Sequence, residues 1–310
     1  MTDLSPKTPA HHRFARYLYA RPRLRLLLLL GIPVLWLVGI YGGSLIALLV
    51  QSFFRLDPFS GTIERVFSFD TWAQLFTDAN VAVIVRTVVM ASAVTITSVV
   101  MAFPLAYYMA RYASPSMKAF LVIAVLVPLW SSYLVRVYSW KLILAADGII
   151  TWFLDLFGAT AVLDAILATP GIGGPSLSIS WLGQFMVFVF IWLPYMILPI
   201  HASLERVPRS LLDASADLGA QPATTFRKVT WPMAIPGVAA GSIFTFSLTL
   251  GDYIVPSIIG DSSPFIGLVI YTQQGVAGNL PAAAAMSFVP IAVMALYLAS
   301  VRKLGAFEAL

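Results

Sequence analysis

One acidic residue, Asp252, lies well inside a long apolar segment of this chain. A charged side chain at the centre of a lipid-facing helix costs roughly 2.5–3.5 kcal/mol, so an ionisable residue there marks a functional hypothesis. A carboxylate at this position would suit the ammonium group of a substrate. Nearby aromatic residues could surround such a cation with their ring faces: Trp130, Tyr133, Tyr138, Trp140 and Tyr253. We therefore expect a substrate pathway at this place.

Other interpretations of these residues stay open. Asp252 could instead form a structural ion pair with Arg86 or Arg136. The aromatic residues could be anchors, because tryptophan and tyrosine are enriched at membrane interfaces. Arg136 is an awkward neighbour for a polycation, so it either pairs with an acid or indicates an anionic or zwitterionic substrate.

Motifs for catalysis are missing from the sequence. It contains no G-x-x-x-x-G-K-[ST] phosphate loop, no H-E-x-x-H and no G-x-S-x-G. It has no cysteine and only three histidines, so neither disulfides nor a zinc site is expected. The sequence therefore predicts no enzyme, no bound cofactor and no ATP hydrolysis by the phosphate-loop route.

A polar stretch from Asp213 to Pro232 lies between two apolar segments. Apolar residues recur before Gly219 at helical spacing, which predicts a short amphipathic helix. Gly219 can end that helix in a left-handed conformation, and Pro222 can open a second short helix. Pro232 then marks the return to the membrane. Such a compact, ordered loop is more than a connector needs.

This stretch resembles the "EAA" loop of ABC importer permeases. The pattern appears as Asp213-Ala214-Ser215, then Gly219, Phe226, and Trp231-Pro232, with Asp in place of Glu and Trp in place of Leu. In that family the loop docks into a groove on the ATP-hydrolysing subunit. The resemblance implies that the ATPase-coupling residues here are Asp213, Ala214, Ser215, Leu218, Gly219, Ala220, Phe226 and Pro232.

Two further segments resemble the spermidine/putrescine permeases. They are residues 127–141, which include Tyr133 and Arg136, and residues 251–260, which include Asp252 and Tyr253. The resemblance implies a type I permease fold, with a five-helix core plus an N-terminal helix. It also implies a second permease subunit, two ATPase subunits that bind ATP and Mg, and an extracytoplasmic solute-binding protein. The implied cargo is a small polar or cationic solute, with a polyamine as the expected case, moved across a bacterial inner membrane.

The amino-acid composition independently supports a membrane protein. The chain has 310 residues, of which 59% are hydrophobic and 11% charged, whereas about a quarter of a soluble domain is charged. We predict an all-α polytopic membrane protein with six transmembrane helices, since each apolar segment is long enough to cross about 30 Å of hydrocarbon. The predicted spans are residues 26–54, 81–110, 117–137, 179–202, 233–259 and 282–301.

Charge distribution predicts the orientation. Most lysines and arginines fall in the two tails, the turn after residue 110 and the 203–232 loop, which the positive-inside rule places in the cytoplasm. The net charge of +5 is therefore attributed to the membrane topology and not to nucleic acid. A seventh span at 148–168 would reverse the side of the loop, so we expect that region to form helices at the outer surface.

The predicted organisation is a basic cytoplasmic tail over residues 1–25, a permease domain over 26–301 and a cytoplasmic tail over 302–310. The competing class is a secondary transporter or channel driven by ion gradients, and a permease for a different small organic solute is a further alternative. A secondary transporter would account for the spans and for Asp252. It would not account for the ordered loop.

Overall fold

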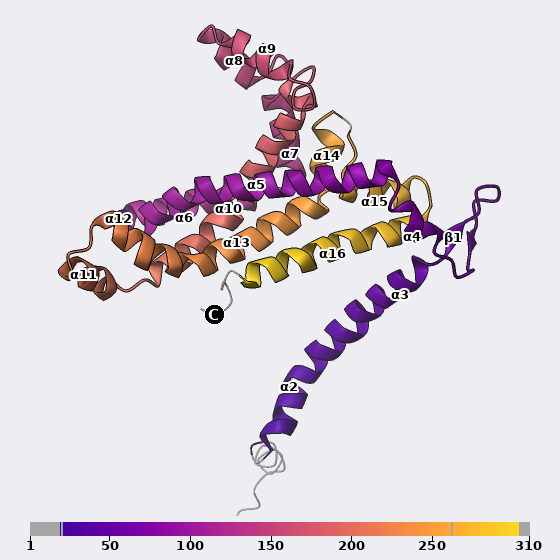
Figure 1. Cartoon of the computed structure of the whole chain (residues 1–310), viewed down its shortest axis with the longest axis horizontal. Helices are drawn as coiled ribbons and strands as arrows, with labels where there is room; N and C mark the ends of the chain where they lie inside the picture. Colours follow the sequence, from indigo (N-terminus) through magenta and orange to yellow (C-terminus); the bar gives the residue numbers. More distant parts are fainter. Residues whose placement is uncertain (1–18, 20, 262, 304–310) are drawn as a thin grey trace, which may run out of the picture.

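Long helices lying side by side form the centre of the molecule (Figure 1). The computed structural model describes residues 19, 21–261 and 263–303. Most of the predicted basic tail, residues 1–18 and 20, lies outside these residues, as does most of the predicted carboxyl tail. The four longest helices of the bundle are α5 (Asp78–Arg111), α10 (Trp181–Glu205), α13 (Trp231–Gly251) and α16 (Leu280–Lys303).

Small residues let the central helices approach closely. Ala102 and Ala106 of α5 share a core with Met196 and Ile200 of α10 and with Ala234 of α13. A side chain added at Gly237 or Gly241 of α13 would overlap α10. Small residues at helix interfaces are typical of membrane bundles, where close backbone packing replaces the hydrophobic driving force.

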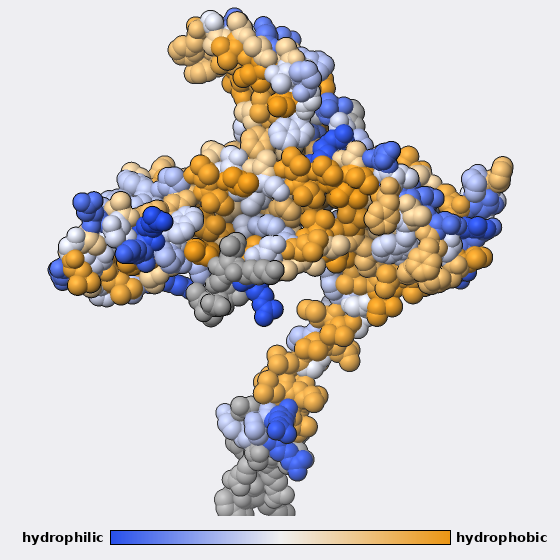
Figure 2. Space-filling model, in the orientation of Figure 1, coloured by the Kyte–Doolittle hydropathy of each residue, from blue (hydrophilic) through white to orange (hydrophobic). Residues whose placement is uncertain are grey.

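The membrane-crossing capacity agrees with the predicted fold class. Five helices in the described part of the chain are long and apolar enough to cross a membrane, and a sixth crossing is available if one bent pair counts as a single span. Figure 2 shows apolar residues over the middle of the bundle on this face, with hydrophilic residues gathered towards its two ends. Such a distribution is typical of a helix bundle whose middle part is surrounded by lipid.

The third span is bent, which corrects the predicted straight helix over 117–137. Helix α6 (Pro115–Trp130) ends at two serines, and α7 (Tyr133–Ile143) leaves at 96° to it. Ser131 has an extended backbone (ψ 152°), and Ser132 also departs from helical geometry (ψ 137°). Hydropathy alone cannot detect such a break, because the residues on both sides of it are apolar.

The fifth span is also placed differently from the prediction of 233–259. Helix α12 (Pro222–Thr225), a π-helical turn η3 (Phe226–Thr230) and α13 follow one another as a single 30-residue helix, Pro222–Gly251. Pro222 opens this helix as predicted, but Pro232 does not begin a separate one. The helix ends before Asp252, and α14 (Ile254–Ile258) follows. Asp252 therefore lies at a break and not inside a helix.

The first span extends away from the bundle (Figure 1). It consists of α2 (Pro22–Trp36), the π-helical segment η1 (Leu37–Gly42) and α3 (Gly43–Gln51). None of the described residues in its most apolar window is buried within this chain. The span is thus the peripheral N-terminal helix that the fold class requires.

Region 148–168 forms two short helices that project beyond the bundle with α7 (Figure 1). Helices α8 (Ile149–Leu156) and α9 (Thr160–Leu167) have eight residues each, which is about 12 Å of helix. Gly158 separates them with a left-handed φ of 64°. No continuous seventh span is formed here, as predicted.

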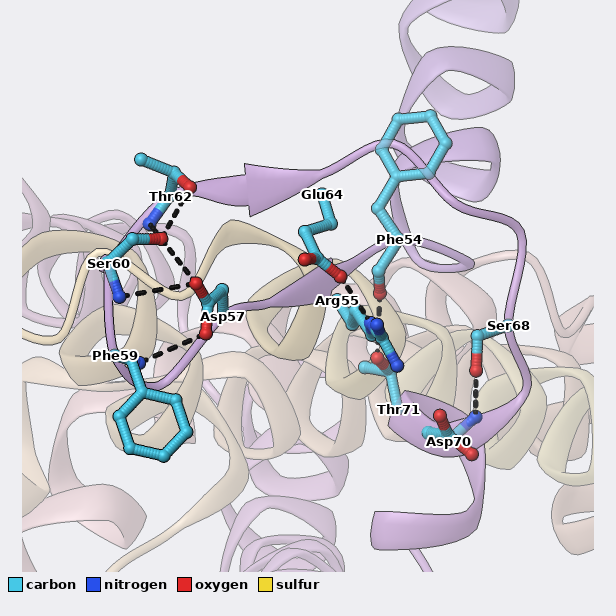
Figure 3. A network of polar contacts seen from close by, with 10 residues as sticks. All are labelled: Phe54, Arg55, Asp57, Phe59, Ser60, Thr62, Glu64, Ser68, Asp70 and Thr71. Carbon is cyan, nitrogen blue, oxygen red and sulfur yellow. Dashed lines mark hydrogen bonds and ion pairs between the residues drawn. The ribbon is translucent and has the colours of Figure 1, made fainter.

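A polar hairpin follows the first span (Figure 3). Strands β1 (Arg55–Leu56) and β2 (Ile63–Glu64) pair antiparallel, and the Arg55 Nε donates to Glu64 Oε2 over 2.6 Å. At the turn, the Ser60 hydroxyl and the Phe59 amide donate to Asp57, and these hydrogen bonds lower the pKa of that carboxyl. Helix α4 (Asp70–Gln74) then leads to α5.

Two short elements that the sequence did not predict complete the fold. Helix α15 (Ile266–Gly275) lies between α14 and α16, and the Ile266 amide donates to Thr87 of α5 over 3.1 Å. The 3₁₀ turn η2 (Leu177–Ile179) precedes α10. Near it, the buried Gln184 side chain donates to the Ile259 carbonyl over 2.6 Å. These contacts fix the residue after α14 to α10 and the start of α15 to α5.

Candidate functional site

Asp252 connects two elements through its carboxylate. Tyr133, at the start of α7, donates its hydroxyl hydrogen bond to Oδ2, and the Val255 amide of α14 donates to Oδ1 over 2.9 Å. Asp252 is only half-buried. The bend between α6 and α7 is what brings Tyr133 to the end of α13. Two predicted pathway residues are thus in direct contact.

A pocket of about 310 Å³ opens beside this carboxylate. Tyr133, Asp252 and Tyr253 line it, together with Trp192 of α10. The rings of Tyr133 and Trp192 are stacked, with centroids 5.7 Å apart and planes 18° apart. An acidic oxygen next to aromatic faces is the arrangement that attracts an organic ammonium.

Trp192 was missed in the sequence, where it is one apolar residue within a span. Its side chain is only 7% exposed, and its Nε1 has no hydrogen-bond partner among the described residues. Buried indole N–H groups are normally paired. Trp192 therefore lines the pocket while its indole N–H stays buried without a described partner. An isolated tryptophan in an apolar run carries no signal that could have identified it.

The alternative interpretation, an ion pair of Asp252 with Arg86 or Arg136, is not formed among the described residues. Arg86 donates to the Pro264 carbonyl over 3.1 Å instead. Arg136 lies over the ring of Tyr133, with its Cζ 5.7 Å from the ring centroid. Within the described chain, two of its guanidinium nitrogens, Nε and Nη1, are buried without a hydrogen-bond partner. Asp252 and Arg136 thus contact the same tyrosine without contacting each other within ion-pair distance.

The remaining predicted pathway residues are not all at the pocket. Tyr253 lines it and stacks on Tyr271, with centroids 4.7 Å apart. Trp130 is 84% exposed and Tyr138 54% exposed, and neither lines the pocket. Trp140 packs against Phe190. In this chain alone, exposed Trp130 and Tyr138 fit the alternative interpretation of interface anchors better than a pocket wall.

The loop between α10 and α12 is ordered around its glycine. Helix α11 (Arg209–Asp217) is capped by Leu218, and Gly219 follows with a φ of 73°. The Gly219 amide donates to Ala216 O over 2.8 Å, and the Ala220 amide donates to Ser215 O over 3.1 Å. This pair of hydrogen bonds is a Schellman motif, which requires a left-handed residue at the glycine position. The predicted glycine stop is present in full.

The predicted contact face of the loop is open to solvent in this chain. Asp213, Ala214 and Leu218 are exposed, and Leu218 reaches 88%. Ser215 points inward instead, and its hydroxyl shares a 2.8 Å hydrogen bond with Thr225 at the start of the next helix. Asp213 and Leu218 thus form an exposed surface that a partner protein can reach.

The base of the loop is held by the neighbouring spans. Phe226 packs edge-on against Phe103 and Tyr107 of α5, with centroids 5.7 and 5.8 Å away. Arg111, at the end of α5, donates to the Val207 carbonyl over 3.3 Å. Lys118 of α6 pairs with Glu205, the last residue of α10. The sequence showed Phe226 but not these partners, because they come from distant segments.

No group of three metal-binding side chains occurs within the described residues. What the fold offers instead is a set of membrane spans, a pocket at a helix break and an exposed, stiff loop. A protein of this kind is the membrane-spanning permease subunit of an ABC importer, which leaves ATP hydrolysis to partner subunits.

The chain belongs to the family of binding-protein-dependent transport system inner membrane components, which it matches over residues 102–305. It is 53% identical to the inner membrane ABC transporter permease protein YdcU of Escherichia coli K12, covering 99% of this chain and 98% of that one. It is 28% identical to the spermidine/putrescine transport system permease protein PotB of the same strain, covering 85% and 91%.

A solved structure supports the fold. The bacterial alginate ABC transporter, crystallised in complex with a periplasmic protein bound to alginate pentasaccharide, has a chain that matches with a TM-score of 0.67 at 15% identity, covering 94% of this chain and 96% of that one. The protein is accordingly a multi-pass inner membrane permease with the type I fold.

Proposed function

We propose that this permease carries a small organic amine, of the polyamine class, through the pocket beside Asp252. The observation that carries the proposal is a carboxylate without a cationic partner, in contact with Tyr133 and next to the faces of Trp192 and Tyr253. A charged carboxylate within a membrane span is stabilised by a neighbouring positive charge, and a substrate ammonium supplies one. Similarity to PotB, whose name specifies spermidine and putrescine, supports the same class.

The proposed energy source is external to the chain. Two ATPase subunits, carrying ATP and Mg, would dock against the 203–232 loop, and a second permease subunit would complete the pathway. A solute-binding protein would deliver the substrate, as the periplasmic protein in the alginate complex suggests by analogy. The positive-inside pattern supports a cytoplasmic position for the loop and both tails.

Coupling would pass through α11. Asp213 and Leu218 are exposed for contact with the ATPase, while the Schellman motif and the Ser215–Thr225 hydrogen bond connect α11 to the fifth span. We expect Asp213 to pair with a basic residue of the ATPase. Charge reversal at Asp213 should then lower co-purification of the ATPase, and unchanged co-purification would contradict the pairing.

Uptake by the reconstituted transporter tests the proposed function. With its ATPase and binding-protein partners in proteoliposomes, the wild type should take up spermidine or putrescine only when ATP is hydrolysed. Asp252→Asn should reduce that uptake by about tenfold or more, because it removes the charge that balances the ammonium. The matched control is Asp261→Asn, which alters an exposed acid on the loop after α14.

Two results would contradict the proposal separately. ATP-dependent uptake of another solute, with none of either polyamine, would remove the polyamine class but keep the permease. Normal polyamine uptake by Asp252→Asn would support the proposed substrate and contradict the proposed role of the Asp252 pocket.

A further inference from the structure

A second cavity lies where α5, α13 and α16 run side by side (Figure 1). Its volume is about 550 Å³, which is larger than that of the pocket beside Asp252, and the two cavities share no residue. On α5 its rim is formed by Ile96 and Val100, whose side chains are 63% and 64% exposed. The cavity is therefore a groove on the outside of the bundle and not part of the pathway.

The groove has the length of one membrane leaflet. It follows α13 from Trp231 to Ser242, and these eleven steps at 1.5 Å each make about 16 Å of helix. The hydrocarbon core of a bilayer is about 30 Å thick, so the groove covers about half of it. Its outer end lies near the middle of the membrane, and its inner end lies at the 203–232 loop.

The lining of the groove offers carbon to its occupant. The hydroxyls of Thr95, Ser242 and Ser300 each donate to a backbone carbonyl of their own helix, over 2.7, 2.8 and 2.8 Å. The ring of Tyr297 is stacked on Phe246, with centroids 4.3 Å apart. Hydroxyls that are already paired need no polar ligand. A hydrocarbon chain can therefore fill the groove by close contact alone.

The end of the groove at the loop is basic. Arg227 and Lys228 are the only charged residues of the 30-residue helix Pro222–Gly251, and both are exposed. They lie one turn before Trp231, which lines the groove and packs on Phe103 with ring centroids 5.2 Å apart. Within the described chain, neither cation has an ion-pair partner. This end therefore attracts an anion.

We propose that the groove binds an anionic phospholipid of the cytoplasmic leaflet. One acyl chain lies along α13 between α5 and α16, and the headgroup phosphate accepts hydrogen bonds from Arg227 and Lys228. Trp231 lies between chain and headgroup, where tryptophan is enriched in membrane proteins. The inference goes beyond the proposed function and needs from it only the cytoplasmic position of the loop.

A lipid in this position would contact the joint between the loop and the fifth span. Arg227 and Lys228 belong to η3, the turn that joins α12 to α13. A headgroup held there restrains η3 against the neighbouring spans. The composition of the cytoplasmic leaflet would then affect how a movement of α11 reaches α13.

The test uses the complete transporter in nanodiscs of phosphatidylcholine. A small fraction of the lipid is phosphatidylglycerol with a photoreactive diazirine in one acyl chain. After illumination, mass spectrometry should find labelled peptides from the groove segments of α5, α13 and α16. The same diazirine chain on phosphatidylcholine should label these peptides at least about fivefold less, because its headgroup carries no net charge.

The basic residues are tested by a double substitution, Arg227→Gln with Lys228→Gln. Each basic residue near the membrane surface contributes about a factor of five to the binding of anionic lipid, so groove labelling should fall by roughly tenfold or more. The matched control, Arg206→Gln with Arg209→Gln, removes two exposed positive charges at the other end of the loop and should label like the wild type.

The groove itself is tested by Val100→Trp, which fills the rim and leaves both charges in place. Labelling should fall by at least about fivefold, because a bulky ring occupies the volume of the acyl chain. Val89→Trp changes another exposed residue of α5, outside the groove, and should not affect labelling. The amount of assembled transporter, measured for every variant, shows whether folding is intact.

Three outcomes would overturn the inference. Equal labelling by the two probes would show that the groove does not select an anionic lipid. Unchanged labelling in the Arg227→Gln, Lys228→Gln protein would remove the headgroup site. Groove peptides that neither probe labels would show that a protein segment, such as the first span of a second permease subunit, fills the groove. None of these results depends on the transported solute, so the polyamine proposal is tested separately.

Discussion

At the scale of single residues, the pocket depends on one hydroxyl. Tyr133 is the side chain that contacts both the acid and the arginine, and it also stacks on Trp192. Its hydroxyl fixes the orientation of the Asp252 carboxylate, while its ring supplies part of the wall. The two functions of the side chain can be separated by removing the oxygen alone.

Tyr133→Phe should keep the ring stack and lose the hydrogen bond to Asp252. A hydrogen bond to a charged group contributes about 1.5–3 kcal/mol, so ATP-dependent uptake should fall by at least about tenfold. Tyr138→Phe, on the same helix but half-exposed and outside the pocket, is the control and should transport normally. Equal uptake by wild type and Tyr133→Phe would mean that this hydroxyl does not serve transport.

The chemistry of the site was only partly predictable. Asp252, Tyr133 and Tyr253 were identified because an acid in an apolar segment and nearby aromatics are visible in the sequence. Their geometry was not, because it depends on two helix breaks, at Ser131–Ser132 and at Asp252–Tyr253. Breaks between apolar residues leave hydropathy unchanged. The same breaks explain why Trp192 joined the site and Trp130 did not.

At the scale of elements, the loop is connected to the spans on both sides. The aromatic contact of Phe226 with α5 and the Lys118–Glu205 pair join its two ends to different spans. A displacement of α11 would therefore reach α5 and α6 as well as the fifth span. The sequence predicted the helix and its glycine stop, because both are local. It did not predict the contacts of Phe226 and of Lys118 with Glu205, because those partners are distant in sequence.

Gly219→Val should abolish transport without preventing insertion into the membrane. Nothing lies within 4 Å of an added Cβ, but the φ of 73° strains a β-branched residue, at a cost of about 1–2 kcal/mol or more. The Schellman motif would open and α11 would lose its orientation. The measurement is ATP-dependent uptake, compared with the amount of the variant protein inserted in the membrane.

Two further substitutions control the Gly219→Val result. Gly219→Asn should recover part of the activity, since asparagine tolerates the left-handed region. Ala216→Val changes an exposed helical residue of α11 and should have a smaller effect. Normal uptake by Gly219→Val would disprove the coupling role of the loop.

At the scale of the whole molecule, α11 and the β1–β2 hairpin lie at opposite ends of the bundle, and six crossings would put them on opposite sides of the membrane. The longest axis of the bundle runs between them (Figure 1). The number of apolar segments was predictable, because hydropathy reports it directly. The cytoplasmic position of α11, which rests on the distribution of positive charges, stays a prediction. The direction in which α7–α9 leave the bundle was not predicted, because it depends on the 96° bend before α7.

Labelling with a membrane-impermeant maleimide can test the topology cleanly, because the chain has no cysteine of its own. A single cysteine at Ser60 or at Asp155 should react in whole spheroplasts. One at Asp217 should react only after the membrane is opened. Labelling of Asp217→Cys from outside would reverse the orientation, and protection of Asp155→Cys would indicate that α8 is not at the outer surface.

The π-helical turn η3 determines where in the fifth span the loss of a residue is tolerated. It holds an extra residue within the helix that runs from α12 to α13. A π-turn accommodates one more residue than an α-turn without changing the phase of the helix on either side. Deleting one residue from 226–230 would therefore let this turn relax to α-helix and leave α13 in phase with the loop. The same deletion within α13, before Gly237, would rotate the two parts of the helix by about 100°, and the face that packs on α10 through Gly237 and Gly241 would then point elsewhere. The π-turn is therefore the place in this helix where the loss of one residue disturbs the packing least.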